Sequence, residues 1–172
     1  MNAKFLVVGA IVGGVVLFLW GAVTHAVLPQ QLHEFKDEQA IAQVIRTNIA
    51  TNGVYLSRQG VFASVAFRPD FGDKTHNILP NLLTQLVTDT LGALLLCLVL
   101  AGIRADSVIG RAGWLTLAGL AVVALKLLPY WNWYGFSPGF IAMEALDVVG
   151  KFFIGGLVLG ALANKMVAAQ PR

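Results

Sequence analysis

The stretch ILPNLLTQLVTDTLGALLLCLVLAGI, residues 78–103, decides the fold, because a single helix of this length and apolarity is suited to crossing a membrane. A helix needs about 20 mainly apolar residues to span the hydrocarbon layer. Three further stretches share this character: Phe5–Leu28, Ala112–Tyr130 and Pro138–Ala163. The sequence therefore predicts an all-α membrane protein in which four transmembrane helices form a single domain over residues 1–172.

The composition supports this class and excludes others. Hydrophobic residues make up 57% of the chain and charged residues only 12%, whereas a soluble domain has about 25% charged residues. The net charge of +3 is spread along the chain and forms no basic run, so we expect no nucleic-acid partner. The single cysteine, Cys97, excludes an intrachain disulfide and a CxxC redox pair.

Lysine and arginine near the ends of the four stretches predict the orientation, because positive residues favour the cytoplasmic side. With four spans, five such residues fall on one side: Lys4, Arg104, Arg111, Lys165 and Arg172. The short loop Trp131–Ser137 on the other side has no charge. The first stretch is longer than the roughly 7–15 apolar residues of a signal peptide, so we expect it to be retained. Both termini are then cytoplasmic in a bacterial inner membrane, with residues 29–77 in the periplasm.

The segment 29–77 has a pattern of its own. Apolar residues recur at helical spacing between about residues 34 and 51, and Asn52-Gly53 predicts that the helix ends at a left-handed glycine. Two strand-like runs follow, Val54–Arg58 and Val61–Phe67, with Gln59-Gly60 as a two-residue hairpin turn. An isolated hairpin is marginal in water, so we expect a small cap on the outer mouth of the helices. The side chains expected to be covered are Phe35, Ile41 and Ile45.

Polar side chains inside the apolar stretches are costly unless they face a bundle interior or a wet cavity. Seven of them are candidates for a ligand site or a buried polar network: His25, Gln85, Asp89, Lys126, Glu144, Asp147 and Lys151. Glu144, Asp147 and Lys151 follow i, i+3 and i+7, so they share one helix face. Asp89 and Asp147 each lie about 14 Å from the outer end of their helix. We therefore expect both carboxylates to meet Lys151 in the bundle interior.

These polar positions stop about halfway across the membrane, and the inner halves of the helices are almost purely apolar. A pore or carrier pathway needs polar groups at every depth, so the pattern favours an outward-facing polar pocket. In the alternative interpretation, the charges pair with one another and fix the helix register without binding a ligand. Buried pairs can specify structure in this way while adding little net stability.

Small residues one helical turn apart predict close helix packing. Gly9-xxx-Gly13 and Gly156-xxx-Gly160 both allow helix backbones to approach. We expect these pairs to pack within the chain, and the alternative is a seam between two copies of a homo-oligomer.

The sequence identifies no cofactor and no metal site. Asp70, Asp73 and His76 are close in sequence, and carboxylates with an imidazole could hold a divalent metal. No recognised metal-binding spacing is present, however. Only one histidine, His25, falls within a span, which argues against a haem held by two histidines.

The N-terminal third contains several short motifs: Trp20-Gly21, His25, Leu28-Pro29, Phe35, Glu38 and Gly53-Val54-Tyr55. Through these motifs, about residues 10–56 resemble a group of small, uncharacterised bacterial membrane proteins with four helices. The resemblance implies an inner-membrane protein, and it brings no activity, cofactor or catalytic residue.

Three functions are consistent with the sequence. The first is a non-enzymatic membrane module, either an accessory subunit of a larger complex or a stand-alone binder, whose cap or polar pocket meets a partner. The second is a small proton- or ion-coupled transporter that uses the buried carboxylates. The third is an enzyme of the outer leaflet, which the absence of a nucleophile–base motif disfavours. The sequence favours the first.

The predicted topology can be tested with reporter fusions. A reporter fused after Arg172 should be active only in the cytoplasm, and one inserted at Gln59-Gly60 only outside, because the positive flanks hold both termini inside. The opposite pattern of activity would contradict the orientation of every loop.

Overall fold

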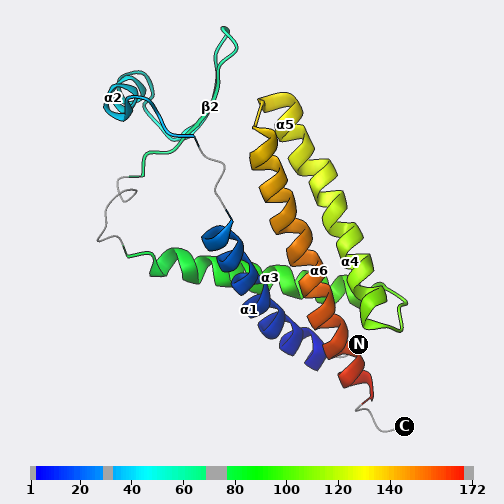
Figure 1. The fold of residues 1–172 in the computed structure, drawn as a ribbon. Coiled ribbons are helices and arrows are strands. Elements are labelled where there is room, and N and C mark those ends of the chain that lie inside the picture. The colour runs from blue at the N-terminus through cyan, green and yellow to red at the C-terminus, as the bar shows by residue number, and fades with distance from the viewer. Residues whose placement is uncertain (1–2, 29–32, 69–76, 169–172) are drawn as a thin grey trace. The chain divides into compact units, whose positions relative to one another are not determined.

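The computed structural model describes residues 3–28, 33–68 and 77–168 (Figure 1). Contacts between residues divide the chain into two compact units. The larger unit, here called the bundle, consists of Met1–Gln31 and Leu79–Arg172, and the small unit is Leu32–Ile78.

Among the described residues, four helices are long and apolar enough to cross a membrane, which confirms the prediction of four such helices. Three of them are α1 (Ala3–Val27), α3 (Leu79–Gly102) and α6 (Pro138–Ala168). The remaining span consists of α4 (Val108–Val122), the π-helical turn η1 (Val123–Leu127) and α5 (Leu128–Tyr134). In Figure 1 the start of α1 and the end of α6 lie at the same end of the bundle, as an even number of spans requires.

The third span is longer than the predicted Ala112–Tyr130 because both of its ends are capped outside that range. Ser107 Oγ accepts a hydrogen bond of 2.9 Å from the Gly110 amide at the start. Gly135, with a φ of 69°, ends the helix in the left-handed conformation that glycine adopts without strain.

A proline explains the π-helical turn inside this span. The Leu128 amide donates to the Val123 carbonyl, five residues earlier, so the turn is wider than in an α-helix. Pro129 has no N–H to donate a hydrogen bond to the carbonyl four residues before it. In a regular helix its ring would also clash with that carbonyl. The widened turn relieves this clash.

Glycines let the helices of the bundle approach closely. A Cβ built on Gly14 of α1 would lie only 2.6 Å from the Cα of Thr90 on α3. A Cβ on Gly156 of α6 would lie 2.6 Å from the Cα of Ala112 on α4. Gly9 and Gly13 likewise contact Cys97 and Ala93 of α3. The small-residue pairs therefore serve packing within the chain, as predicted.

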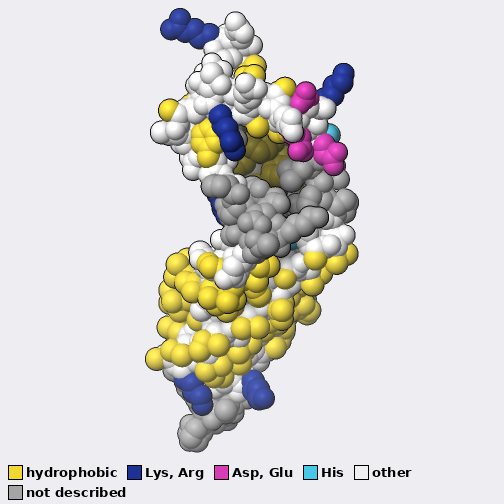
Figure 2. Space-filling model, turned by 90° about the vertical axis from the view of Figure 1, so that its left-hand side faces the viewer, with side chains coloured by type: hydrophobic (Ala, Val, Ile, Leu, Met, Phe, Trp, Pro, Cys, Tyr) yellow, Lys and Arg dark blue, Asp and Glu magenta, His cyan; other side chains and the backbone are white. Residues whose placement is uncertain are grey.

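The half of the bundle around Phe5, Leu100 and Leu159 is a closed apolar core. Its buried side chains come from all four spans: Phe5, Leu17, Ala93, Leu96, Cys97, Leu100, Leu115, Leu159 and Ala163. Cys97 is fully buried there and packs as a small hydrophobic side chain. The outside of the bundle is also apolar, and hydrophobic side chains cover most of the face drawn in Figure 2. Such a surface suits contact with lipid chains.

The small unit contains the predicted helix and hairpin, with two corrections. Helix α2 spans Glu38–Asn48, and Asp37 caps it by accepting a 2.9 Å hydrogen bond from the Ala40 amide. It ends at an extended Ile49. The predicted left-handed Gly53 is wrong, because among the described residues only Gly60 and Gly135 have positive φ. Gly53 instead begins strand β1.

Strands β1 (Gly53–Leu56) and β2 (Phe62–Val65) pair antiparallel, with Gly53 opposite Val65. The hairpin loop has three residues and not the predicted two, because Ser57 still pairs with Val61 through a 2.9 Å hydrogen bond. Gly60 takes the left-handed position of this loop, with a φ of 82°.

The apolar face of α2 is not covered within the small unit. No residue of α2 is buried, and Phe35 and Val44 are 61% and 58% exposed. Phe35, Ile41 and Ile45 were expected to be buried against one another or against the membrane surface. The first alternative is wrong, since Phe35 and Ile41 are exposed and only Ile45 is half-buried. Burial against the membrane stays a prediction.

The close contact between α1 and α3 gives a stability test. Gly14→Ala should lower the free energy of unfolding by about 1–3 kcal/mol, because the new methyl group meets backbone that cannot move aside cheaply. Gly92→Ala is the matched control, since a Cβ there has nothing within 4 Å. Unfolding in mixed micelles measures both variants. Equal stability of the two would show that α1 and α3 do not touch at Gly14.

Candidate functional site

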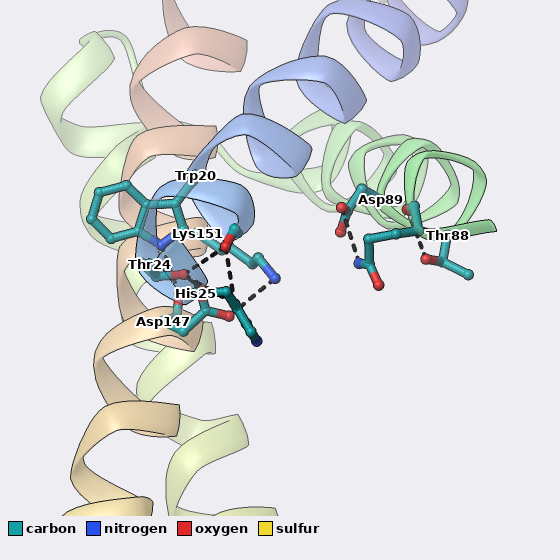
Figure 3. Close-up of polar contacts among 9 residues, drawn as sticks. Trp20, Thr24, His25, Thr88, Asp89, Asp147 and Lys151 are labelled. Carbon is teal, nitrogen blue, oxygen red and sulfur yellow. Dashed lines mark hydrogen bonds and ion pairs between the residues drawn. The ribbon is translucent and has the colours of Figure 1, made fainter. Parts of the chain in front are cut away.

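The carboxylate of Asp147 is the centre of a polar cluster that joins α6 to α1 (Figure 3). Its Oδ2 forms an ion pair of 3.0 Å with Lys151 Nζ, one turn further along α6. Its Oδ1 accepts a hydrogen bond of 2.6 Å from Thr24 Oγ1 on α1. The Asp147 backbone carbonyl accepts a further bond of 3.1 Å from the indole N–H of Trp20. Both carboxylate oxygens of this buried residue are therefore satisfied.

Glycines on the two helices make room for this cluster. A Cβ on Gly150 of α6 would lie 2.2 Å from the Trp20 ring, so only glycine lets the indole cross α6 at this height. A Cβ on Gly21 of α1 would lie 3.3 Å from both Cε and Nζ of Lys151. The lysine thus passes directly over the α1 backbone.

His25 lies in the last turn of α1, next to the cluster. Its Nδ1 is 2.9 Å from the Gly21 carbonyl oxygen and 3.4 Å from Thr24 Oγ1. Because a carbonyl oxygen only accepts, Nδ1 is the donor in the shorter contact. The imidazole is therefore held against its own helix, with its ring exposed.

Asp89 does not join Asp147 and Lys151, so the predicted three-residue network is wrong. Asp89 is buried on α3, where its Oδ2 accepts a 3.0 Å hydrogen bond from Gln85 Nε2 on the same helix. Figure 3 shows Asp89 on α3, apart from the cluster around Asp147. The physical reason is that α3 packs mainly on α1 and only slightly on α6. Equal depth in two helices does not bring side chains together unless those helices face each other.

Two other predicted residues also lie outside the cluster. Lys126 is exposed in η1, where its Nζ stands 4.9 Å from the centre of the Tyr130 ring. This contact is a cation–π interaction. Glu144 is half-buried on α6, and it forms no hydrogen bond or ion pair within the described part of the chain. Of the two acidic residues Glu144 and Asp147 on this face of α6, only Asp147 therefore takes part in the cluster.

A pocket of about 330 Å³ opens beside the cluster, where α1 and α3 separate. The two helices touch at Gly14 and Thr90, and the pocket lies between the C-terminal part of α1 and the N-terminal part of α3. Its eight lining residues are Phe18, Gly21, Ala22 and His25 of α1, Asn81, Leu82 and Gln85 of α3, and Lys151 of α6. It therefore brings together three of the seven predicted residues, namely His25, Gln85 and Lys151.

Two residues of this region, Trp20 and Thr24, were not predicted as site residues, and Asn81 was placed only on one polar stripe of its helix with Gln85 and Asp89. Trp20 and Thr24 hold Asp147, and Asn81 lines the pocket. A usable signal was present for Thr24, because it lies among Gly21 and His25 at the polar end of an otherwise apolar helix. Tryptophan is too common near membrane interfaces for Trp20 to stand out.

The opposite end of the bundle carries a second polar contact. Arg111 Nη1 donates to the Gly160 carbonyl oxygen at 3.1 Å and also to Oδ1 of Asn164. Arg111 was expected to mark the cytoplasmic side, and in addition it ties α4 to α6. Its Nε is buried without a hydrogen-bond partner in the described residues.

The small unit has a groove of its own, of about 580 Å³, between α2 and the end of β2. Apolar side chains such as Ile45, Ile49 and Phe67 form its wall, together with Arg46 and Arg68.

Within the described ranges, no group of three or more His, Cys, Asp or Glu side chains is arranged to hold a metal ion. Asp70, Asp73 and His76, the residues weighed as metal ligands, lie outside the described residues. Comparison with known proteins gives no relative: no family model matches the sequence, and no match was found among curated proteins or among solved structures.

The ion pair gives a second stability test. Lys151→Met should cost a few kcal/mol, toward the low end of the roughly 3–5 kcal/mol for breaking a buried pair, because Asp147 keeps its charge without a counter-ion. The double variant Lys151→Met/Asp147→Asn should be less destabilised than Lys151→Met alone. Lys126→Met, which removes an exposed lysine of the same bundle, is the control and should change little. Additive losses in unfolding measurements would show that Lys151 and Asp147 do not interact.

Proposed function

We propose that this chain is a non-enzymatic binding or accessory module of a bacterial inner membrane, with both termini in the cytoplasm. The pocket between α1 and α3 is its binding site, open toward the periplasmic half of the membrane. One observation carries the proposal: the polar side chains His25, Gln85 and Lys151 line a pocket, while the other half of the bundle is a closed apolar core.

The same core disfavours the transporter alternative. A carrier needs a polar route, or a change of shape that opens one, on both sides of its binding site. Beyond Gly14 the four spans meet through side chains such as Phe5, Leu100 and Leu159, which are fully buried. Among the described residues the core between these contacts is apolar, and the polar contact of Arg111 with Asn164 lies at the far end of the bundle. A site that binds from one side therefore fits the packing better.

The enzyme alternative has little support from the geometry. Within the described residues, the Thr24 hydroxyl lies near two possible bases, His25 Nδ1 at 3.4 Å and the Asp147 carboxylate. Thr24 is buried, however, and its hydroxyl is held by Asp147 at 2.6 Å. A hydroxyl in this position stabilises the contact between helices and is not open to a substrate.

The exposed apolar face of α2 supports an accessory role. Phe35, Ile41 and Val44 are exposed within the small unit, and such a face is commonly covered by a partner or by lipid. We propose that the small unit lies on the periplasmic side, as the lysine and arginine distribution predicts. There it meets the periplasmic surface of the inner membrane or a partner subunit.

Purification in mild detergent tests the proposed function. Molecules that co-purify with the wild type should be lost from Ala22→Phe, because the larger side chain fills part of the pocket. Ala26→Phe is the matched control, since Ala26 is an exposed alanine one turn further along α1 and does not line the pocket. Mass spectrometry of the bound lipids, small molecules and proteins reads the result. Identical bound material in all three proteins would contradict a binding role for the pocket.

A further inference from the structure

The pocket beside Lys151 is open to its surroundings along one side. Five of its lining residues are exposed, namely Ala22, His25, Asn81, Leu82 and Gln85. All five belong to the membrane-spanning helices α1 and α3. A ligand can therefore reach the pocket sideways from the outer leaflet, between the separating ends of these helices.

The pocket offers hydrogen-bond donors that are not used inside the protein. The Lys151 ammonium has three donor positions, and Asp147 is its hydrogen-bonding partner among the described residues. The amide of Asn81 makes no hydrogen bond within the same part of the chain. Unpaired polar groups are costly where water is scarce. A ligand that brings oxygen acceptors to Lys151 and Asn81 would remove this cost.

The charges around the pocket disfavour an anionic ligand. Lys151 supplies one positive charge, which Asp147 balances at 3.0 Å. A second carboxylate, Asp89, borders the pocket through its hydrogen bond to Gln85. One ammonium and two carboxylates thus lie at or next to the pocket, so the charges around it are balanced toward negative and do not favour a phosphate. An uncharged head group with carbonyl or hydroxyl oxygens has no charge for these carboxylates to repel.

The depth and the shape of the pocket also favour the head group of an amphiphile. Lys151 crosses α1 at Gly21, and Gly21 lies six residues before the end of α1 at Val27. At 1.5 Å per residue this is about 9 Å below the helix end. Phe18, Ala22 and Leu82 form apolar walls around the lysine. A volume of about 330 Å³ suits a head group with the start of its chain, but not a whole lipid.

We propose that this pocket binds an uncharged amphiphile whose carbonyl oxygens accept hydrogen bonds from Lys151 and Asn81 while its apolar chain leaves between α1 and α3. The inference rests on the proposed function and specifies its ligand. Two sources carry this chemistry in a membrane: the ester carbonyls of a diacylglycerol, and the ring carbonyls of a quinone with an isoprenoid tail.

Competition between defined lipids tests the proposal. The full chain is placed in nanodiscs of phosphatidylcholine that contain, separately, a diacylglycerol, an isoprenoid quinone or phosphatidylglycerol. Native mass spectrometry then measures how much of each molecule stays bound. We expect the wild type and Ala26→Phe to retain one of the two uncharged amphiphiles, and Ala22→Phe to retain it roughly tenfold less well. Which of the two is retained distinguishes an ester ligand from a quinone.

A charge variant tests the Lys151 hydrogen-bond donor separately from the shape of the pocket. Lys151→Met/Asp147→Asn removes the ammonium without leaving an unpaired carboxylate, so it should fold and yet lose the uncharged amphiphile. Unchanged retention by this variant would overturn the role of Lys151.

The remaining outcomes separate this inference from the proposed function. Retention of phosphatidylglycerol that Ala22→Phe abolishes would overturn the uncharged ligand and leave the pocket as a binding site. Equal retention by Ala22→Phe and Ala26→Phe, or no retention of either uncharged amphiphile, would also overturn the inference. If the co-purified material of the wild type is then still lost from Ala22→Phe, the pocket binds a ligand of another class and the proposed function stands.

Discussion

A carboxylate buried in a membrane must be paired, and the position of α1 against α6 follows from this constraint on Asp147. An isolated charge at the centre of a span costs at least about 2.5–3.5 kcal/mol on insertion scales. Asp147 avoids this cost with one partner from its own helix, Lys151, and one from α1, Thr24. The bond to Thr24 fixes the rotation of α1, because a hydroxyl donor at 2.6 Å tolerates little displacement.

Once α1 is fixed against α6, its opposite contact with α3 determines where the bundle opens. Gly14 and Thr90 bring α1 and α3 together near the middle of their length. The two helices cross at an angle (Figure 1) and touch from Gly9 to Gly14, so the C-terminal part of α1 and the N-terminal part of α3 leave the space that becomes the pocket. The polar side chains of His25, Gln85 and Lys151 line this space. The other end closes with Phe5, Leu100 and Leu159.

The sequence predicts those features that lie within one helix or depend on residue size. The ion pair of Asp147 with Lys151 follows from i, i+4 spacing, and the role of Gly9 and Gly13 follows from their small size. Contacts that depend on which helices face each other cannot be predicted from spacing or residue size. Asp89 has the same depth as Asp147, but it lies on α3, which barely touches α6.

Local turn chemistry explains a second group of errors. Asn52-Gly53 has the composition of a helix end, yet α2 ends four residues earlier, at Ile49, where an extended backbone leads toward the strand. The left-handed conformation is needed at Gly60 instead, because a three-residue hairpin loop places it there. Spacing identifies the glycines that can adopt this conformation, and the pairing of Ser57 with Val61 selects the one that does.

The small unit has a different source of stability from that of the bundle. None of its described residues, 33–68, is buried, so no hydrophobic core offsets the entropy lost when it folds. An 11-residue helix and a two-stranded hairpin are each marginal in water. Because Phe35, Val44, Val54 and Leu56 all expose apolar area, contact with another apolar surface is the term that can balance this entropy. Contact with a lipid or protein surface would therefore stabilise the fold of the small unit.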